Sequence, residues 1–166
     1  RRQRQMCIRD SDTAFLARLV GPGGKVHAFD IQEEALRSAR ERLREEGLLT
    51  DAVCFHLASH SRLAELVRGP VKAIMFNLGY LPGGDRNLIT RTDSTLAALE
   101  QAVNLTAPNG ILSVMCYPGH EGGNTEAAAV EQLLSRLPHH LWRTGKYQLL
   151  NTSTPAPFQI CAFRLD

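Results

Sequence analysis

The chain has 166 residues, of which 43% are hydrophobic and 22% are charged, and its formal net charge is +2. This length suffices for one domain with a single sizeable core, and so small a net charge does not by itself indicate a nucleic-acid partner. No apolar stretch approaches the roughly 20 residues that a membrane span needs, and the amino end lacks the apolar segment of a secretory signal. We therefore expect no membrane partner.

The four cysteines are spread along the chain without a C-x-x-C pair. Cys54, Cys116 and Cys161 each lie inside an apolar run, which favours reduced core side chains over a disulfide or a metal site. Reduced core cysteines are typical of the cytoplasm. We therefore expect a cytoplasmic protein without a metal centre.

Apolar runs of strand length alternate with segments of helical periodicity along most of the chain. Clusters of β-branched and aromatic residues predict strands at residues 25–31, 53–58, 71–76 and 111–117. Helices are expected between and after them, at residues 33–47, 61–67, 93–106 and 125–137. Two last extended runs, residues 142–150 and 157–165, predict an antiparallel hairpin. This order indicates an α/β fold with a mostly parallel sheet.

Asp30 stands at the end of the strand expected at residues 25–31. In nucleotide-binding α/β folds an acidic residue at such a strand end accepts hydrogen bonds from ribose hydroxyls. The alternative is an N-cap for the helix that follows at once. Gln32 could reach the same ligand or face solvent.

Ser59, His60 and Ser61 follow the strand expected at residues 53–58, and the two serines could cap the next helix. Since carboxyl ends of parallel strands meet at one edge of a sheet, these side chains could instead border a bound nucleotide beside Asp30. A lone histidine in a loop is more often simply solvated, so both interpretations stay open.

Residues 77–85 read N-L-G-Y-L-P-G-G-D and follow the buried strand expected at residues 71–76. A strand that opens into a polar, glycine-rich turn is where α/β sheets place their chemistry. Asn77 offers an amide, Tyr80 a ring and a hydroxyl, and Asp85 a carboxylate. We expect this turn to form a wall of the active site.

Four segments together carry a family resemblance: residues 27–32 (H-A-F-D-I-Q), 77–85, 117–123 (Y-P-G-H-E-G-G) and 151–158 (N-T-S-T-P-A-P-F). They resemble the MnmM or YtqB-like family, small bacterial methyltransferases first labelled rRNA methylases. The resemblance covers roughly residues 12–166. Its central motif is specific, because ordinary methyltransferases carry a short Asn/Asp-Pro-Pro-Tyr type of sequence at this strand end.

This resemblance implies a Rossmann-like class I methyltransferase fold with S-adenosylmethionine as cofactor. It also implies methyl transfer to the exocyclic amine of 5-aminomethyl-uridine, often 2-thiolated, at the wobble position in the anticodon loop of tRNA. Asp30, Gln32, Ser59, His60 and Asn77 would then border the cofactor.

Within the family's reaction, Asn77 would accept hydrogen bonds from the substrate amine and orient its lone pair. Tyr80 would give a stacking face to uracil or to the adenine edge. Asp85 could attract the aminomethyl group and accept its proton, or it could hold the glycine loop. His120 could act as a base or contact phosphate, or it could belong to a structural turn.

One departure from the family concerns the amino end. The family opens with a strand and a turn of the form D-x-x-x-G-N-G-x-D-T, whose backbone approaches the methionine part of the cofactor. Only the trailing Asp12 and Thr13 remain here, so Asp12 is the cofactor residue carried over from that turn. We expect residues 1–11 to be a non-native or disordered leader before a methyltransferase domain at residues 12–166, with the first strand missing or replaced.

Two other functions stay open, a methyltransferase acting on a small-molecule amine and a nucleotide-binding module with impaired catalysis. An NAD-dependent oxidoreductase is less favoured, because the dinucleotide fingerprint is absent from the sequence. A homodimer is a reasonable arrangement for a compact domain that must hold an RNA loop, although no segment of the sequence demonstrates one.

Overall fold

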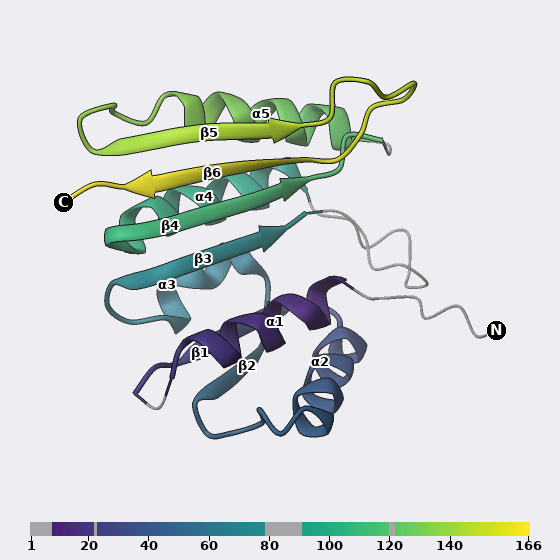
Figure 1. Ribbon diagram of the computed structural model, residues 1–166, viewed down its shortest axis with the longest axis vertical. Helices are drawn as coiled ribbons and strands as arrows, with labels where there is room; N and C mark the ends of the chain where they lie inside the picture. The colour runs from purple at the N-terminus through teal and green to yellow at the C-terminus, as the bar shows by residue number, and fades with distance from the viewer. Residues whose placement is uncertain (1–7, 22, 79–90, 120–121) are drawn as a thin grey trace. The chain divides into compact units, whose positions relative to one another are not determined.

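The computed structural model describes residues 8–21, 23–78, 91–119 and 122–166, and for residues 8–11 it describes the backbone only (Figure 1). Contacts divide the described chain after His60 into two compact units. Each unit has a sheet of its own.

The first unit is a parallel pair of strands with two helices. Its elements are α1 (Ile8–Leu19), β1 (Val26–Asp30), α2 (Glu33–Glu45) and β2 (Val53–Leu57). Val26 lies opposite Val53 and Asp30 lies opposite Leu57, so both strands end at the same edge. Helix α1 contacts both α2 and β1. The sequence did not predict α1, which begins inside the expected leader, and residues 1–7 of that leader lie outside the described residues.

Helix α2 has the amphipathic pattern that the sequence indicated. Its buried residues lie along a single stripe, because Leu36, Ala39 and Leu43 are each about one helical turn apart and Ala35 adjoins Leu36. Arg40 of α2 lies over the Phe55 ring with its guanidinium carbon 4.6 Å from the ring centroid, so the side of the sheet that carries Phe55 faces α2. Because side chains alternate along a strand, His27 and His56 lie on the other side.

The second unit is a four-stranded sheet with the order β3-β4-β6-β5. The 3₁₀ turn η1 (His60–Arg62) leads into it from the first unit. Strands β3 and β4 are parallel, and β6 is antiparallel to both of its neighbours. The elements after η1 are α3 (Leu63–Leu66), β3 (Val71–Asn77), α4 (Thr92–Leu105), β4 (Thr106–Cys116), α5 (Gly123–Ser135), β5 (Trp142–Gln148) and β6 (Phe158–Arg164).

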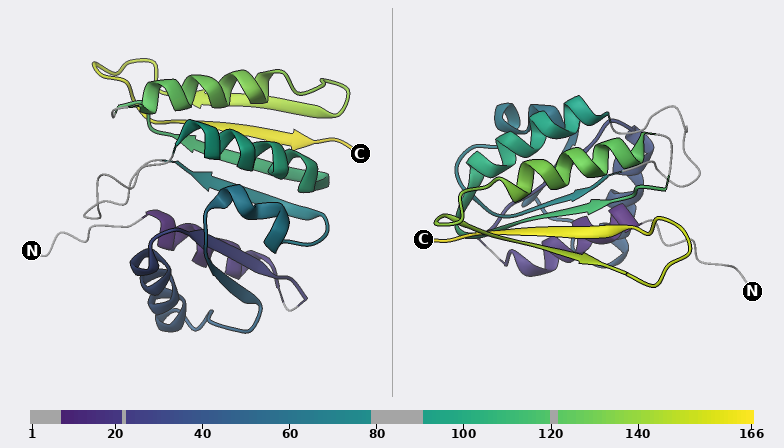
Figure 2. Two further views of the ribbon diagram at one scale, coloured as in Figure 1. Left: turned by 180° about the vertical axis from the view of Figure 1, so that it is seen from behind. Right: turned by 90° about the horizontal axis from the view of Figure 1, so that it is seen from above.

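Helices α4 and α5 pack against each other on one face of this sheet (Figure 2). The core between helices and sheet consists of fully buried aliphatic side chains, namely Leu99, Leu112, Val114, Val130, Leu134 and Ile160. Lys146 of β5 spans the layers, because its ammonium group lies 4.1 Å from the Phe158 ring centroid and 2.7 Å from a carboxylate oxygen of Glu131 on α5.

The expected α/β fold, with parallel pairing and a C-terminal antiparallel hairpin, is confirmed. The largest boundary error is at β4, which begins at Thr106 rather than at residue 111. The sequence T-A-P-N-G reads as a turn, and Asn109 does adopt a left-handed φ of 57°. Thr106 nevertheless pairs with Val71 before the register shifts, so the strand starts where α4 ends. Among the described helices, none combines the length and apolar character required to cross a membrane.

Candidate functional site

In the second unit, the described parts of three of the four motif segments lie at one edge of the sheet. Asn77 ends β3 opposite Met115 of β4, and Phe158 opens β6 opposite Cys116. The segment after Cys116 and the loop before Phe158 therefore leave the sheet beside Asn77. A Cβ atom placed on Gly119 would lie 3.6 Å from the carbonyl oxygen of Pro155, so these two segments are neighbours.

Asn77 is thus placed at this edge, as the sequence predicted, and it is half-buried. Tyr80, Asp85 and His120 lie outside the described residues. Their roles stay predictions.

In the first unit, the carboxyl ends of β1 and β2 bring the nucleotide-binding candidates together. The N–H of Ala58 donates to the carbonyl oxygen of Asp30 at 3.0 Å, so Ser59 and His60 follow β2 beside the end of β1. The N–H of Gln32 donates to Oδ1 of Asp30 at 2.9 Å. The N-cap of α2 is Gln32 and not Asp30, so the Asp30 carboxylate fixes the turn into the helix without capping it.

The segment from Ser61 to Ala64, after His60 in the chain, is held by a residue that the sequence did not reveal. The Nε2 of Gln101 on α4 donates to the carbonyl oxygen of Ser61, and its Oε1 accepts from the N–H of Ala64, both at 2.7 Å. The N-cap of α3 is Arg62, so neither Ser59 nor Ser61 occupies the capping position that the sequence allowed. Gln101 gave no signal in the sequence because it lies on α4, far from every motif.

Asp12 lies near the amino end of α1 and is half-buried. Helix α1 packs on β1 and is joined to it by a short segment, so its amino end points toward the carboxyl end of β1. Asp12 is therefore at the same edge of the first unit as Asp30.

A histidine pair on the face of β1 and β2 away from α2 was not predicted. Nδ1 of His27 and Nε2 of His56 share a hydrogen bond of 3.0 Å, and the two ring planes differ by 11°. Phe29 stacks on His56 with 4.5 Å between ring centroids. Burial lowers the pKa of both histidines, and for His27 the charges of His56 and Lys25 lower it further.

A buried polar contact joins the first turns of α4 and α5. The hydroxyl of Thr95 donates to Oε1 of Glu126 at 2.7 Å, and the two residues are 0% and 4% exposed. Sequence reasoning missed this pair, because each residue alone looks like an ordinary helix residue.

Two arginines, Arg91 and Arg143, lie at opposite edges of the second unit. Arg91 is exposed and immediately precedes α4, which runs back from the Asn77 edge to the start of β4. Arg143 lies at the start of β5, which is at the opposite edge because β5 pairs antiparallel with β6. Its Nη1 also donates to the carbonyl oxygens of His139 and Trp142.

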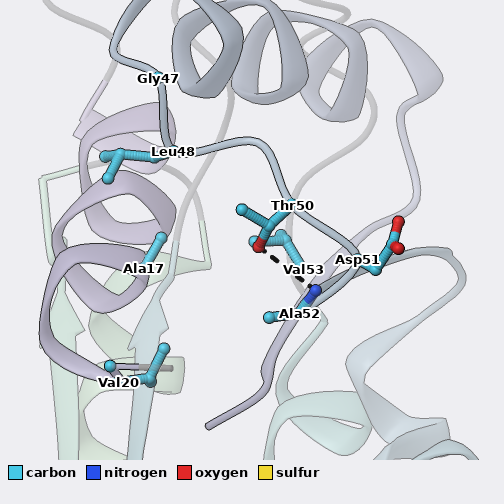
Figure 3. A pocket seen from close by; sticks show the side chains of 9 residues that line it. Ala17, Val20, Gly47, Leu48, Thr50, Asp51, Ala52 and Val53 are labelled. Carbon is cyan, nitrogen blue, oxygen red and sulfur yellow. Dashed lines mark hydrogen bonds between the residues drawn. The ribbon is translucent and has the colours of Figure 1, made fainter. Parts of the chain in front are cut away.

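A pocket of about 480 Å³ lies in the first unit, away from these residues (Figure 3). It is lined by α1 and by the segment before β2, including Val20, Leu48, Thr50 and Val53. It therefore opens at the amino ends of the strands, opposite Asp30. Within the described residues, no three His, Cys, Asp or Glu side chains are grouped so that they could hold a metal ion.

The parallel strands, the helices between them, the C-terminal hairpin and the polar strand ends define a class I methyltransferase fold. The chain belongs to the family described as "Putative rRNA methylase", whose model matches residues 26–163. The resemblance seen in the sequence is thereby confirmed.

Individual relatives agree with this assignment. A solved protein of the same description from Clostridium thermocellum is 34% identical with a TM-score of 0.89, covering 95% of this chain and 84% of that one. The Streptococcus mutans protein SMU.1697c, solved in complex with SAH, is 33% identical with a TM-score of 0.84 and the same coverage. Its bound SAH agrees with the expectation that S-adenosylmethionine is the cofactor.

A curated relative from Arabidopsis thaliana is named tRNA (mnm(5)s(2)U34)-methyltransferase, chloroplastic. It is 36% identical over 169 residues, which cover 96% of this chain. The chain spans 61% of the length of that relative.

Proposed function

We propose that this chain is an S-adenosylmethionine-dependent methyltransferase that methylates the exocyclic amine of 5-aminomethyl-uridine, with or without 2-thiolation, at the wobble position of tRNA. The observation that carries the proposal is the convergence of Asn77, residues 117–119 and the loop before Phe158 at one sheet edge. The name of the Arabidopsis thaliana relative supports the choice of substrate.

The donor set at the end of β1 and β2 fits an adenosyl group. A carboxylate such as that of Asp30 accepts hydrogen bonds from ribose hydroxyls, and Gln32, Ser59 and His60 offer polar groups beside it. Asp12 would approach the same ligand from α1. When bound, S-adenosylmethionine supplies an electrophilic methyl group on a sulfonium.

Methyl transfer to an amine depends mainly on positioning. The amine nitrogen must be neutral, and its lone pair must face the methyl carbon in line with the departing sulfur. Asn77 accepts a hydrogen bond from the amine N–H and so aims the lone pair. The new N–C bond forms as the C–S bond breaks, and Asp85 takes the proton that the amine releases. Tyr80 stacks on the uracil ring, and His120 contacts the substrate phosphate.

Arg91 supports an RNA substrate rather than a small amine. It is exposed at the same sheet edge as Asn77, where an anticodon-loop phosphate would lie if the base entered beside Asn77. A cytoplasmic location and a homodimer remain predictions from the sequence.

The proposal is tested by incubating the protein and S-adenosylmethionine with tRNA from cells that lack this wobble methylation. Nucleosides are then analysed by mass spectrometry, and we expect methylaminomethyl-uridine to appear. Fully modified tRNA is the matched control and should gain no further methyl group. If 5-aminomethyl-uridine stays unchanged while calorimetry shows that S-adenosylmethionine binds, the tRNA assignment is wrong and small amines become the substrates to test.

A further inference from the structure

We propose that Glu126 is a positioning residue for methyl transfer, because its hydrogen bond with Thr95 fixes the amino ends of α4 and α5 to each other. The proposal rests on the function proposed above. It concerns a buried contact between the first turns of the two helices that follow β3 and β4 in the chain.

The two helices begin where the amine-binding segments end. Helix α4 follows the segment that starts at Asn77, and α5 follows the segment that starts after Cys116. Thr95 is in the first turn of α4 and Glu126 is in the first turn of α5. Their 2.7 Å hydrogen bond therefore connects the far ends of both segments.

The backbone of each first turn is tied to the same contact. The N–H of Thr95 donates to the carbonyl oxygen of Arg91 at 3.0 Å, and the N–H of Glu126 donates to that of Gly122, also at 3.0 Å. Gly122 has a φ of 76°, a conformation that favours glycine. A shift of either side chain would be passed to Arg91 or Gly122, the last residues before the helices.

A carboxylate is a costly group for this place. Glu126 is 4% exposed, and burying a charge is unfavourable unless hydrogen bonds and dipoles compensate it. The amino end of α5 and the Thr95 hydroxyl provide part of that compensation. The pKa of the Cys116 thiol at the end of β4 is raised to about 12, chiefly by burial and secondly by the nearby Glu126.

Two apolar side chains would contribute at least as much to the free energy of unfolding of the whole protein as this pair, since replacing a buried polar pair by apolar groups is often neutral or stabilising. What an apolar pair lacks is a directional bond with a fixed length. We infer that the pair is present for geometry and not for stability.

The decisive variant is therefore the double substitution Thr95→Val and Glu126→Met, which keeps volume and removes the hydrogen bond. We expect its thermal midpoint to stay at or above that of the original protein. Its turnover with tRNA should fall about tenfold, while the dissociation constant for S-adenosylmethionine changes less than about twofold. The single variants Glu126→Gln and Thr95→Ser keep an acceptor and a donor, and both should retain turnover within about threefold.

Amide hydrogen exchange gives a readout that needs no activity. In the double variant, the amides of residues 92–96 and 122–127 should exchange about tenfold faster, while those of β4 and β6 keep their protection.

Three results would overturn the proposal: a double variant with the original turnover, one that fails to fold, or unchanged exchange in both helix ends. Failure of the original protein to methylate tRNA would instead count against the proposed function. The exchange experiment would still test whether the Thr95–Glu126 contact fixes the amino ends of α4 and α5 to each other.

Discussion

The carboxylate of Asp30 accepts a hydrogen bond from the N–H of Gln32 at 2.9 Å, so the residue that ends β1 also fixes the turn into α2. Substituting Asp30→Asn keeps an oxygen for that bond and removes the negative charge. We expect calorimetry to show at least tenfold weaker S-adenosylmethionine binding with little change in thermal midpoint, because hydrogen bonds to a charged group contribute about 1.5–3 kcal/mol. Glu33→Gln, an exposed carboxylate on the same helix, is the control and should bind normally.

Asn77→Ala should separate chemistry from cofactor binding. The side chain lies at the end of β3, where we place the substrate amine, and its loss should reduce turnover about a hundredfold through misorientation of the amine. The dissociation constant for S-adenosylmethionine should change less than about threefold. Asn104→Ala is the control, because Asn104 is exposed near the carboxyl end of α4, away from the Asn77 edge, and it should leave both quantities unchanged. Equal losses of turnover and cofactor binding in Asn77→Ala would refute its assigned role.

Arg91 and Arg143 form a matched pair for RNA binding, since the two are at opposite edges of the same sheet. We expect Arg91→Gln to weaken tRNA binding. It should also make the binding constant depend less steeply on salt concentration, by about the amount that corresponds to one lost phosphate contact, while Arg143→Gln has little effect on either quantity. Filter binding at several salt concentrations measures both changes. Similar losses in the two variants would show that the RNA does not approach through the Asn77 edge.

The His27–His56 pair should make the protein less stable in mild acid. Burial lowers the pKa of each folded-state histidine below the ordinary value of 6.5, so the unfolded chain binds protons first. The contribution of the pair to the free energy of unfolding is complete above about pH 6.5 and is lost as the pH falls below that value. Thermal midpoints measured between pH 7.5 and 5.5 should therefore drop more steeply for the original protein than for His56→Phe. His140→Gln, at an exposed position, should follow the original curve.

Gly110 should be intolerant of a side chain. A Cβ atom there would lie 2.6 Å from the carbonyl oxygen of Ala107 and 3.1 Å from that of Lys72, and backbone atoms cannot move away cheaply. We expect Gly110→Ala to destabilise the protein by roughly 1–3 kcal/mol in urea unfolding. Gly145→Ala is the matched control, because its Cβ atom would meet nothing within 4 Å. A Gly110→Ala protein as stable as the control would contradict the tight packing at the start of β4.

Much of the fold could be predicted from local patterns. The stripe formed by Leu36, Ala39 and Leu43 predicted α2, and the apolar run before Asn77 predicted β3, since helix and strand periods are properties of neighbouring residues. The start of β4 could not be predicted in this way. Thr106 becomes part of a strand only because Val71, far away in sequence, pairs with it.

In the candidate site, too, some features follow from local sequence and others depend on tertiary packing. Asp30 and Asn77 could be placed at strand ends from local pattern alone, and strand ends are where α/β folds carry their chemistry. The Thr95–Glu126 contact and the His27–His56 pair could not be predicted, since each joins residues about thirty positions apart through tertiary packing. Contacts of this kind leave no local pattern in the sequence.

The position of β5 at the end of the order β3-β4-β6-β5 has a consequence for self-association. Among the described strands, β5 has a neighbour on one side only, and an open strand edge can template aggregation. Arg143 is exposed near the start of this strand, and two copies that approached edge to edge in antiparallel fashion would bring like charges together. This charge should disfavour pairing through β5 when the protein is concentrated.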